Sequence, residues 1–309
     1  MQTIFPSDTG RCISGLLESA AAFLESHQID APRREAEHLL AARLGCDRLR
    51  LFTDVQKTVS ESAREGFLQD LSRRAAHEPL QYILGEVEFY GLTFSVSSGV
   101  FIPRPETELI VEAARTLSAP PVNILDLCTG SGALAIALAA SFPSSTVFAT
   151  ERSAEALSVA KLNAEKNRCA AQMTFFLGDL LEPLQKAGIK TATFDLIVSN
   201  PPYISEADRE TLPPEVRDYE PKMALFAEEG GRAFYRRILF DAPAFLNEKG
   251  TILLEMGFGQ SEWLRHFIEN QINRSNPKLK LSFLRDWAGI ERIARITLQK
   301  NDLKTATNG

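Results

Sequence analysis

Residues 122–135 read VNILDLCTGSGALA, and this stretch decides the fold. Its first part, 122–127, is a short apolar run, and the run ALAIALAA (133–140) has helical character. The glycines between the two runs permit positive φ angles and allow a ligand to approach the backbone closely. A buried strand that turns through glycines into a helix is typical of α/β sheets that bind a ligand at their carboxyl edge.

The alternation of strand and helix continues after residue 140. The first three apolar segments have the length of buried strands, a helix-like segment lies between them, and the last two segments suit an antiparallel pair. The expected strands are TVFAT (146–150), TFFL (174–177), FDLIVS (194–199), TILLEM (251–256), LKLSFLRD (279–286) and RIARITLQ (292–299), and the expected helix is AEALSVAKLNAEKN (154–167). We therefore predict an α/β fold with a doubly wound sheet.

The first 85 residues have a helical pattern instead. Apolar residues between positions 13 and 24 follow the i, i+3, i+4 spacing of one buried helix face. Two further helices are indicated by capping and first-turn residues. The first of these is expected to begin at Pro32, with Asp30 as the capping residue of the helix. The second is expected to begin near Ser60 or Ser62.

Residues 86–97, EVEFYGLTFSVS, separate the helical part from the α/β part. Apolar residues alternate on both sides of Tyr90-Gly91, which is typical of a β-hairpin. The polar end of the chain has the composition of a disordered tail. The expected layout is a helical domain at 1–85, a hairpin linker at 86–100, an α/β domain at 101–300 and a disordered tail at 301–309.

The composition excludes several classes of protein. The chain has 309 residues, of which 44% are hydrophobic and 24% are charged, as in ordinary globular proteins. No apolar run approaches the ~20 residues that span a bilayer, and the N-terminus lacks the pattern of a signal peptide. The net charge is −6, divided as −2 in residues 1–85 and −4 in the rest. This charge argues against direct binding to a nucleic-acid backbone.

The four cysteines are far apart and form no CxxC pair. Because paired cysteines mark disulfide frameworks and zinc sites, neither is expected here, and no metal is expected. This usage suits a reducing compartment, so we expect a cytoplasmic protein. The cysteines are Cys12, Cys46, Cys128 and Cys169.

Two carboxylates accompany the Gly-rich turn. Asp126 precedes it, and Glu151, 19 residues after Gly132, ends the next strand, where it can accept both hydrogens of a ribose diol. Residues 130–135 also match the dinucleotide pattern G-x-G-x-x-A, but Asp126 would repel a pyrophosphate. S-adenosylmethionine carries a sulfonium and an ammonium group and no phosphate. We therefore predict S-adenosylmethionine as the cofactor, and a tight turn without a ligand is the structural alternative.

Asp179 and Leu180 follow the third expected strand of the α/β part. A carboxylate at this sheet edge can accept a hydrogen bond from an adenine amino group, and an apolar neighbour can cover the ring. The same residues also suit a helix cap or a turn, so both interpretations stay open.

The tetrapeptide Asn200-Pro201-Pro202-Tyr203 directly follows the strand FDLIVS, at the edge where such sheets bind ligands. The side-chain carbonyl of Asn200 and the backbone carbonyl of Pro201 can accept two hydrogen bonds from one NH2 group. The prolines stiffen the loop, and Tyr203 can stack on a flat group. This pattern predicts methylation of a planar amide or amine nitrogen, which needs orientation and two acceptors rather than a separate base.

With these motifs in place, the chain resembles the PrmC/HemK family, the protein-glutamine N5-methyltransferases of peptide chain release factors. The resemblance covers about residues 13–297. FIPRPETE and the RDYEP part of EVRDYEP distinguish this family from the broader amino-methyltransferases. The motifs are APRREAEHLL (31–40), EPLQYILGEVEFYGL (78–92), FIPRPETE (101–108), DLCTGSGALA (126–135), NPPYI (200–204), EVRDYEP (215–221) and DWAGIERI (286–293).

The resemblance implies a class I methyltransferase fold, Rossmann-like with a seven-stranded sheet, and a small N-terminal helical domain that holds part of the protein substrate. It implies that the substrate is the glutamine of a Gly-Gly-Gln loop in a release factor. The implied glutamine-binding and catalytic residues are Asn200, Pro201, Pro202 and Tyr203. The implied cofactor-binding residues are Asp126, Leu127, Cys128, Thr129, Gly130, Glu151, Leu180 and Asn200, to which the strand-edge argument adds Asp179.

The chain departs from the family pattern at two positions. Cys128 replaces a frequent glycine, and Glu151 replaces the usual aspartate. The roles of Phe101, Arg104 and Glu106 stay open between lining the pocket and, for Arg104, forming a structural ion pair. Two other functions are considered: methylation of adenine N6 in DNA or RNA, and a binding module that keeps the cofactor as a structural ligand.

Overall fold

The computed structural model describes residues 11–274 and 279–299, which form two compact units. Unit 1 comprises the described residues up to Glu86 together with Leu212–Tyr219. Unit 2 comprises Val87–Thr211 together with the described residues from Glu220 onward. The expected tail at 301–309 lies outside the described residues. Within the described ranges, every helix is too short or too polar to pass through a lipid bilayer.

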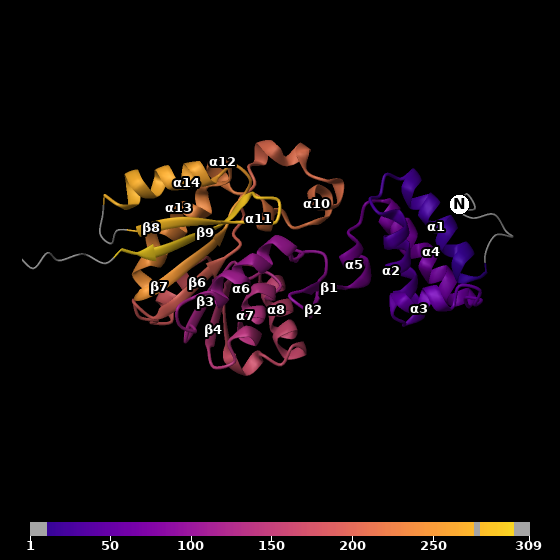
Figure 1. Ribbon diagram of the computed structural model, residues 1–309, viewed down its shortest axis with the longest axis horizontal. Helices are drawn as coiled ribbons and strands as arrows, with labels where there is room; N and C mark the ends of the chain where they lie inside the picture. The colour runs from indigo at the N-terminus through magenta and orange to yellow at the C-terminus, as the bar shows by residue number, and fades with distance from the viewer. Residues whose placement is uncertain (1–10, 275–278, 300–309) are drawn as a thin grey trace, which may run out of the picture. The chain divides into compact units, whose positions relative to one another are not determined.

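The helices of unit 1 within residues 13–84 pack around one apolar core (Figure 1), and its last helix is joined to them by polar contacts with Arg74 and Ala76. Phe67, Leu39 and Leu24 are among its fully buried side chains. The three longest helices are the three that the sequence predicts, so that prediction is confirmed. The other helices have six residues or fewer, which is too short for a periodic pattern to reveal them. The helices are α1 (Ile13–Ser26), α2 (Pro32–Leu44), α3 (Arg48–Thr53), α4 (Glu61–Ala75), α5 (Leu80–Leu84) and α10 (Pro214–Tyr219).

The caps of α2 and α4 settle two details of the sequence analysis. Asp30 does not cap α2: the N-cap is Ala31, in a left-handed conformation at φ 47°, and no side chain caps this end. Pro32 is the first helical residue, as predicted. At α4 the cap is Ser60 rather than Ser62, because the Ser60 hydroxyl accepts a hydrogen bond from the Ala63 N–H at 3.4 Å.

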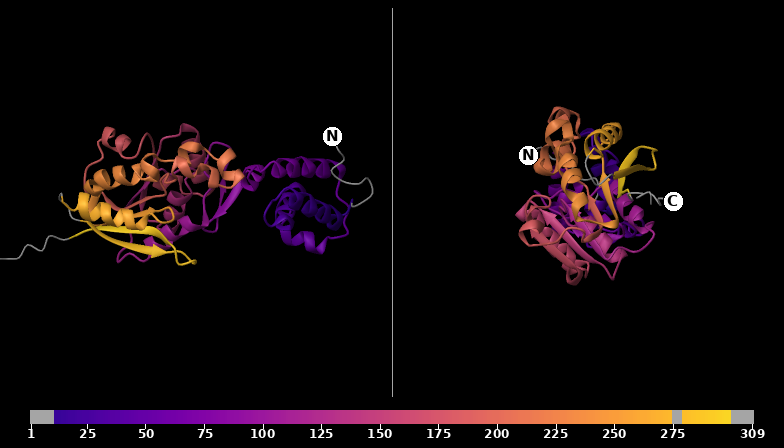
Figure 2. Two further views of the ribbon diagram at one scale, coloured as in Figure 1. Left: turned by 90° about the horizontal axis from the view of Figure 1, so that it is seen from above. Right: turned by 90° about the vertical axis from the view of Figure 1, so that its left-hand side faces the viewer.

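Unit 2 contains, within the described residues, a seven-stranded sheet in the order β5-β4-β3-β6-β7-β9-β8. The pairs among the first five strands are parallel, and β9 is antiparallel to both β7 and β8. Figure 2 shows β8 and β9 in yellow at one edge of this unit. The predicted α/β class and the seven-stranded, Rossmann-like sheet are confirmed. The strands are β3 (Asn123–Leu127), β4 (Thr146–Glu151), β5 (Met173–Leu177), β6 (Phe194–Ser199), β7 (Leu246–Glu255), β8 (Leu279–Arg285) and β9 (Glu291–Leu298).

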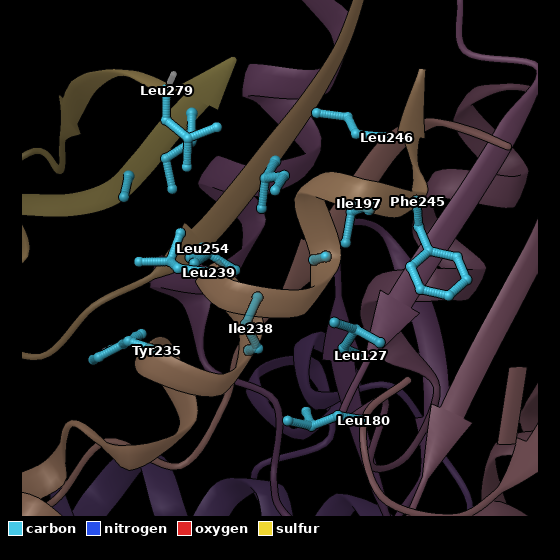
Figure 3. Close-up of a cluster of buried hydrophobic side chains, with 14 of the residues drawn as sticks. Leu127, Leu180, Ile197, Tyr235, Ile238, Leu239, Phe245, Leu246, Leu254 and Leu279 are labelled. Carbon is cyan, nitrogen blue, oxygen red and sulfur yellow. The ribbon is translucent and has the colours of Figure 1, made fainter. Parts of the chain in front are cut away.

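Helices cover both faces of this sheet (Figure 1), because successive side chains of a strand point to opposite faces. On β3, Leu125 packs into a cluster with α13, which Figure 3 shows, while Ile124 packs into a second cluster with α6 and α7. The remaining segments are η1 (Pro105–Thr107), α6 (Glu108–Arg115), α7 (Ala133–Ser141), α8 (Ala154–Lys166), η2 (Ala170–Gln172), α9 (Glu182–Lys186), η3 (Glu206–Thr211), α11 (Lys222–Leu225), α12 (Glu228–Gly231), α13 (Ala233–Asp241), η4 (Ala242–Phe245), α14 (Ser261–Phe267) and η5 (Ile268–Ile272).

The predicted hairpin is present as β1 (Glu86–Phe89) and β2 (Leu92–Ser95), which pair with each other in a separate two-stranded sheet. The rings of Phe89 and Phe94 contact edge to face with centroids 6.1 Å apart. Both belong to the apolar cluster that contains α6 and α7. The apolar face of the hairpin is therefore part of the core of unit 2.

Two strands differ from the sequence analysis. The segment 174–177 was expected to be buried, but β5 is an edge strand with half-exposed side chains, and Leu177 is 55% exposed. As an edge strand it has β4 as its one neighbour, and its side chains are only partly covered: Phe176 packs against one apolar cluster and Phe175 against another. β7 begins at Leu246, before the predicted start at 251. The prediction began too late because it followed an apolar run, and the polar residues 247–249 interrupt that run.

The register of the strands brings their carboxyl ends level with each other. Leu127 of β3 pairs with Thr150 of β4 on one side and with Ser199 of β6 on the other. Ser199 in turn pairs with Leu254 of β7. The residues that follow these positions therefore gather at one edge of the sheet. Here the strand order reverses: β4 and β5 follow on one side of β3, and β7 follows on the far side of β6.

Candidate active site

A cavity in unit 2 lies at this edge of the sheet and brings together most of the residues predicted to bind ligands. Three predicted residues do not line it: Leu127 points into the hydrophobic core (Figure 3), and Pro201 and Tyr203 are likewise outside the wall. The predicted residues that do line the cavity are Asp126, Cys128, Thr129, Gly130, Glu151, Asp179, Leu180, Asn200 and Pro202.

Asp126 is a buried carboxyl group in the cavity wall, only 1% exposed. The Thr129 hydroxyl donates to its Oδ2 at 2.6 Å, whereas its Oδ1 has no hydrogen-bond partner among the described residues. Burial raises the pKa of Asp126 to about 7, and the neighbouring Glu151 charge acts in the same direction. Because an unpartnered buried oxygen is costly, this position is suited to a cationic or N–H-bearing ligand.

The turn after β3 depends on left-handed backbone conformations. Cys128 has φ 60° and Gly130 has φ 57°. The frequent family glycine at position 128 would adopt this angle without strain, so Cys128 adopts it at a conformational cost. At Gly132, φ is 81°, and a Cβ atom would lie 3.1 Å from the Cβ of Ala160 on α8. The glycine thus allows α7 and α8 to approach each other beside the cavity.

Glu151 is held in place by the turn that it faces. The N–H of Gly130 donates to its Oε2 and the N–H of Ser153 donates to its Oε1, both at 2.8 Å. A carboxylate oxygen has more than one acceptor position, so both oxygens retain capacity for a ligand in the cavity. The longer Glu side chain is accommodated here, and its predicted role at a ribose diol stays a prediction.

Asp179 and Leu180 lie together in the cavity wall after β5. Arg237 of α13 donates to Asp179 Oδ2 at 2.8 Å. Leu180 has a positive φ of 48°, and its buried side chain packs into the core cluster of Figure 3. The predicted contact of this pair with an adenine ring stays a prediction.

The loop that begins at Asn200 leaves β6 beside the Gly-rich turn. The Asn200 amide nitrogen donates to the Thr107 hydroxyl at 3.0 Å. Pro201 and Pro202 are buried, and the Tyr203 hydroxyl donates to Glu255 at 3.1 Å. The Tyr203 carbonyl accepts a hydrogen bond from Gln260 at 2.9 Å. The structure therefore fixes this loop through its side chains and its backbone.

Thr107 and Glu255 are two site residues that sequence reasoning missed. The Thr107 hydroxyl donates to Glu255 Oε2 at 2.5 Å. Burial raises the pKa of Glu255 to about 7, against the lowering effect of its hydrogen bonds from Thr107 and Tyr203. One signal was available for Glu255: it is a carboxylate directly after the apolar run of residues 252–254, as Asp126 is near the end of the apolar β3. Thr107 lies inside FIPRPETE, but nothing in its spacing indicated a role.

Arg104 forms a structural ion pair with the buried Glu220, so two of the quoted motifs, FIPRPETE and EVRDYEP, are connected through their side chains. Glu220 also accepts a hydrogen bond from the Ile102 N–H at 3.3 Å. The Arg104 guanidinium lies over the Phe101 ring, 4.9 Å from its centroid, and Phe101 lines the cavity. Glu106 is exposed and does not line it. Of the two roles considered for Arg104, the structure shows the ion pair, and Arg104 does not line the cavity.

The rest of the wall is largely apolar and comes from segments far apart in the sequence. No periodic pattern or motif connects these residues, which explains why the sequence analysis did not name them. The main ones are Phe89, Pro103, Leu134, Pro221, Met223 and Phe234. An apolar wall with a few convergent acidic and amide groups is typical of a small-molecule site.

The chemistry of the wall separates the two cofactors considered. Three carboxylates line the cavity, from Asp126, Glu151 and Asp179, and one of them has a buried oxygen without a partner in the described structure. This set fits a ligand with cationic groups and a ribose, and it opposes a pyrophosphate. Among the described residues, no group of three or more His, Cys, Asp or Glu side chains is arranged to hold a metal ion.

Two family models match the chain. The model described as PrmC N-terminal domain matches residues 15–85, and the model described as methyltransferase small domain matches residues 92–212. Together they span α2 to α5 and nearly all of α1 in unit 1, and the part of unit 2 that carries the Gly-rich turn and the Asn200 loop.

Curated relatives match over most of their length. A release factor glutamine methyltransferase of Geobacter sulfurreducens is 43% identical over 250 residues, which covers 81% of this chain and 86% of the relative. One of Rhodopirellula baltica is 34% identical and covers 95% of this chain and 98% of the relative. One of Chlorobaculum tepidum is 42% identical over 78% of this chain and 84% of the relative.

The fold is also similar to solved methyltransferase structures. The hMettl16 catalytic domain, in complex with the MAT2A 3′UTR hairpin 1, has a TM-score of 0.56 and covers 75% of this chain and 82% of the solved chain. The sequence identity is 18%, so this similarity concerns the fold alone.

Proposed function

The chain belongs to the release factor glutamine methyltransferase family, and from this premise we propose how its cavity carries out the reaction. The protein is an S-adenosylmethionine-dependent protein glutamine methyltransferase. It methylates the side-chain amide nitrogen, N5, of a release factor glutamine. One observation carries the assignment of the cavity: its wall contains both a buried carboxylate oxygen of Asp126 that has no partner in the described part of the chain and two residues of the Asn200 loop.

S-adenosylmethionine supplies an electrophilic methyl group when it is bound. Asp126 offers its unpartnered oxygen to a cationic group of this ligand, and Glu151, held by Gly130 and Ser153, offers acceptors to the ribose. Leu180 and Asp179 are proposed to cover and contact the adenine. Cys128, Thr129 and Gly130 contribute the backbone of the turn, while Leu127 supports the turn from the core.

The proposed substrate group is the NH2 of a glutamine side chain. An amide nitrogen is a poor nucleophile because its lone pair is delocalised. Two acceptors, the Asn200 side-chain carbonyl and the Pro201 backbone carbonyl, orient this nitrogen and stabilise the positive charge that develops on it. The stiff Pro201-Pro202 segment keeps the two acceptors in place. Tyr203 is proposed to act from behind this loop, since its hydroxyl is bonded to Glu255.

The proposed partner is a peptide chain release factor, with the glutamine in its Gly-Gly-Gln loop. The helices of unit 1, which match the family's N-terminal domain, are proposed to bind part of this protein. A glutamine on an exposed loop can enter a cavity without the strand distortion that a duplex adenine requires. The negative net charge also disfavours a nucleic-acid substrate.

The test is methyl transfer from labelled S-adenosylmethionine to a purified release factor, with DNA and RNA assayed in parallel. We expect one methyl group on the glutamine of the Gly-Gly-Gln loop, located by peptide mass spectrometry. A release factor with this glutamine replaced by alanine is the matched control and should remain unlabelled. Methylated adenine with an unmodified release factor would refute the proposed substrate, and cofactor binding without any transfer would favour a binding module.

The variant Asn200→Ala sharpens the test. It removes an acceptor that acts on the substrate nitrogen, so methyl transfer should fall by far more than cofactor affinity. A variant that keeps near-normal turnover would show that the Asn200 loop is only a turn.

A further inference from the structure

A chain of hydrogen bonds extends from the Asn200 loop into the core of unit 2. Asn200 Nδ2 donates to Thr107 Oγ1 at 3.0 Å, and Thr107 donates to Glu255 Oε2 at 2.5 Å. Tyr203 donates to the other Glu255 oxygen at 3.1 Å. Thr107 and Glu255 are 5% and 2% exposed. Glu255 does not line the cavity, so it acts on this site only through its neighbours.

The donor inventory of these groups fixes the orientation of the Asn200 amide. An ionised carboxylate only accepts hydrogen bonds, and a threonine hydroxyl has one proton to donate. When Glu255 is ionised, that proton goes to Glu255, and Thr107 can offer only a lone pair to Asn200. The Asn200 group that faces Thr107 must then be its NH2, so the carbonyl oxygen is at the opposite end of the amide.

We infer that Thr107 and Glu255 are positioning residues for methyl transfer, because their hydrogen bonds keep the Asn200 carbonyl oxygen, and not its NH2, available to the substrate nitrogen. This inference rests on the proposed function, in which that oxygen accepts a hydrogen bond from the glutamine NH2. Without these hydrogen bonds, the Asn200 side-chain amide can rotate by half a turn. Its NH2 group, a donor, then faces the NH2 group of the substrate glutamine, which is also a donor.

Protonation of Glu255 allows the direction of the chain to reverse. A neutral carboxyl group with its proton on Oε2 donates to Thr107, Thr107 then donates to Asn200, and the Asn200 group facing Thr107 becomes the carbonyl oxygen. The charged and titratable groups around Glu255 in the described structure are Glu106, which favours protonation, Arg292, which opposes it, the Tyr203 hydroxyl, which donates to it, and Tyr235, whose hydroxyl donates to the Glu255 backbone carbonyl at 3.2 Å. Burial dominates and raises the pKa of Glu255 to about 7. The orientation of Asn200 is therefore fixed by the chain above this pH and is no longer fixed below it.

The experiment compares single-turnover methyl transfer to a release factor between about pH 6 and pH 9 at saturating cofactor and substrate. Saturation removes effects of Asp126 on cofactor binding. Thr107→Val keeps the shape of the side chain and removes the hydroxyl, and Thr107→Ser restores the hydroxyl. Glu255→Gln removes the titration. Thr251→Val, at a buried site on the same strand outside the cavity wall, is the matched control.

We expect Thr107→Val to lower the rate constant by about 10- to 100-fold, with the cofactor Kd unchanged within about twofold, because the reacting groups are misoriented rather than lost. Thr107→Ser should recover most of the rate, and Thr251→Val should react like the wild type. The wild-type rate should rise with pH through about 7, and Glu255→Gln should lack this rise.

A Thr107→Val variant with the wild-type rate, or a Glu255→Gln variant that keeps the rise near pH 7, would overturn the inference. If Thr107→Val does not fold, the pH profile of Glu255→Gln decides alone. Failure of the proposed function gives a different result: the wild type itself transfers no methyl group to the glutamine at any pH, and the inference fails with it.

Discussion

The side chain of Asn163 on α8 donates a hydrogen bond to the carbonyl of Ser131, in the Gly-rich turn, at 2.9 Å. The same amide group also exchanges two hydrogen bonds with the backbone of Ser95 on β2, at 2.7 and 3.0 Å. Asn163 is fully buried. One side chain therefore joins the hairpin, α8 and the cofactor turn.

Replacing Asn163 by alanine should destabilise unit 2, since one buried and two partly buried backbone groups lose their partner. We expect a decrease in the free energy of unfolding of about 2–4 kcal/mol, measured by urea denaturation. Asn167→Ala is the control. The side-chain amide of Asn167 donates hydrogen bonds to the carbonyls of Thr93 and Asn163 nearer the surface, so this substitution should lower the free energy of unfolding by less than about 1 kcal/mol. Equal losses in the two variants would contradict this explanation.

Cofactor affinity should depend on pH through Asp126. The pKa of this carboxyl group is raised to about 7, so the group gains its charge as the pH rises through that value. A cationic ligand binds the charged form, and affinity should rise with pH and level off above about pH 8. Calorimetry of S-adenosylmethionine binding checks this. Asp126→Asn should bind about tenfold more weakly at high pH and lose most of the slope; an unchanged slope would assign it to another group.

Gly132→Ala tests the close approach of α7 and α8. The added Cβ meets a positive φ of 81° and lies 3.1 Å from Ala160 Cβ and 3.2 Å from its Cα. Gly188→Ala is a matched control, because φ there is 73° but nothing lies within 4 Å of the new atom. We expect about 1 kcal/mol for Gly188→Ala, from the backbone alone, and about 1–3 kcal/mol more for Gly132→Ala. Similar thermal shifts in both would show that the contact is harmless.

Arg74→Ala should destabilise unit 1. Arg74 is 3% exposed and pairs with Glu35 and with Glu215, the latter at 2.6 Å. Its removal leaves Glu35, whose pKa is already raised by burial, without a counter-charge. Breaking a buried pair in this way costs about 3–5 kcal/mol. Arg73→Ala is the control, because Arg73 pairs with Glu78 near the surface and should cost under about 1 kcal/mol.

The sequence predicted the seven strands of the sheet and the helices α7 and α8, because each has a clear apolar run or a helical period. It did not predict α6, α13 or α14, and it placed the start of β7 at 251 instead of Leu246. The edge strand β5 was wrongly expected to be buried, since an apolar run does not say how many neighbours a strand has. The cap of α2 was also wrong: Asp30 has the right chemistry, but the backbone at Ala31 turns left-handed and leaves Asp30 outside the first turn.

Sequence reasoning placed the cofactor turn and the Asn200 loop at one edge of the sheet, because both follow parallel strands. It could not find the chain from Asn200 through Thr107 to Glu255, which joins residues far apart in the sequence. That chain depends on the register of β6 with β7 and on where η1 packs. Neither leaves a periodic signal in the residues themselves.

The membership of Leu212–Tyr219 in unit 1 has a consequence for the order of events during synthesis. Glu215, which pairs with Arg74, and Tyr219, whose hydroxyl donates to the Ala76 carbonyl at 2.6 Å, are made after β3, β4, β5 and β6. A nascent chain that has released only its first 86 residues from the ribosome therefore lacks part of its first unit. The apolar core of that unit comes from residues 13–84 alone, but the ion pair of Arg74 with Glu215 and the hydrogen bond of Tyr219 form only once the strands that carry the cofactor turn and the Asn200 loop have emerged.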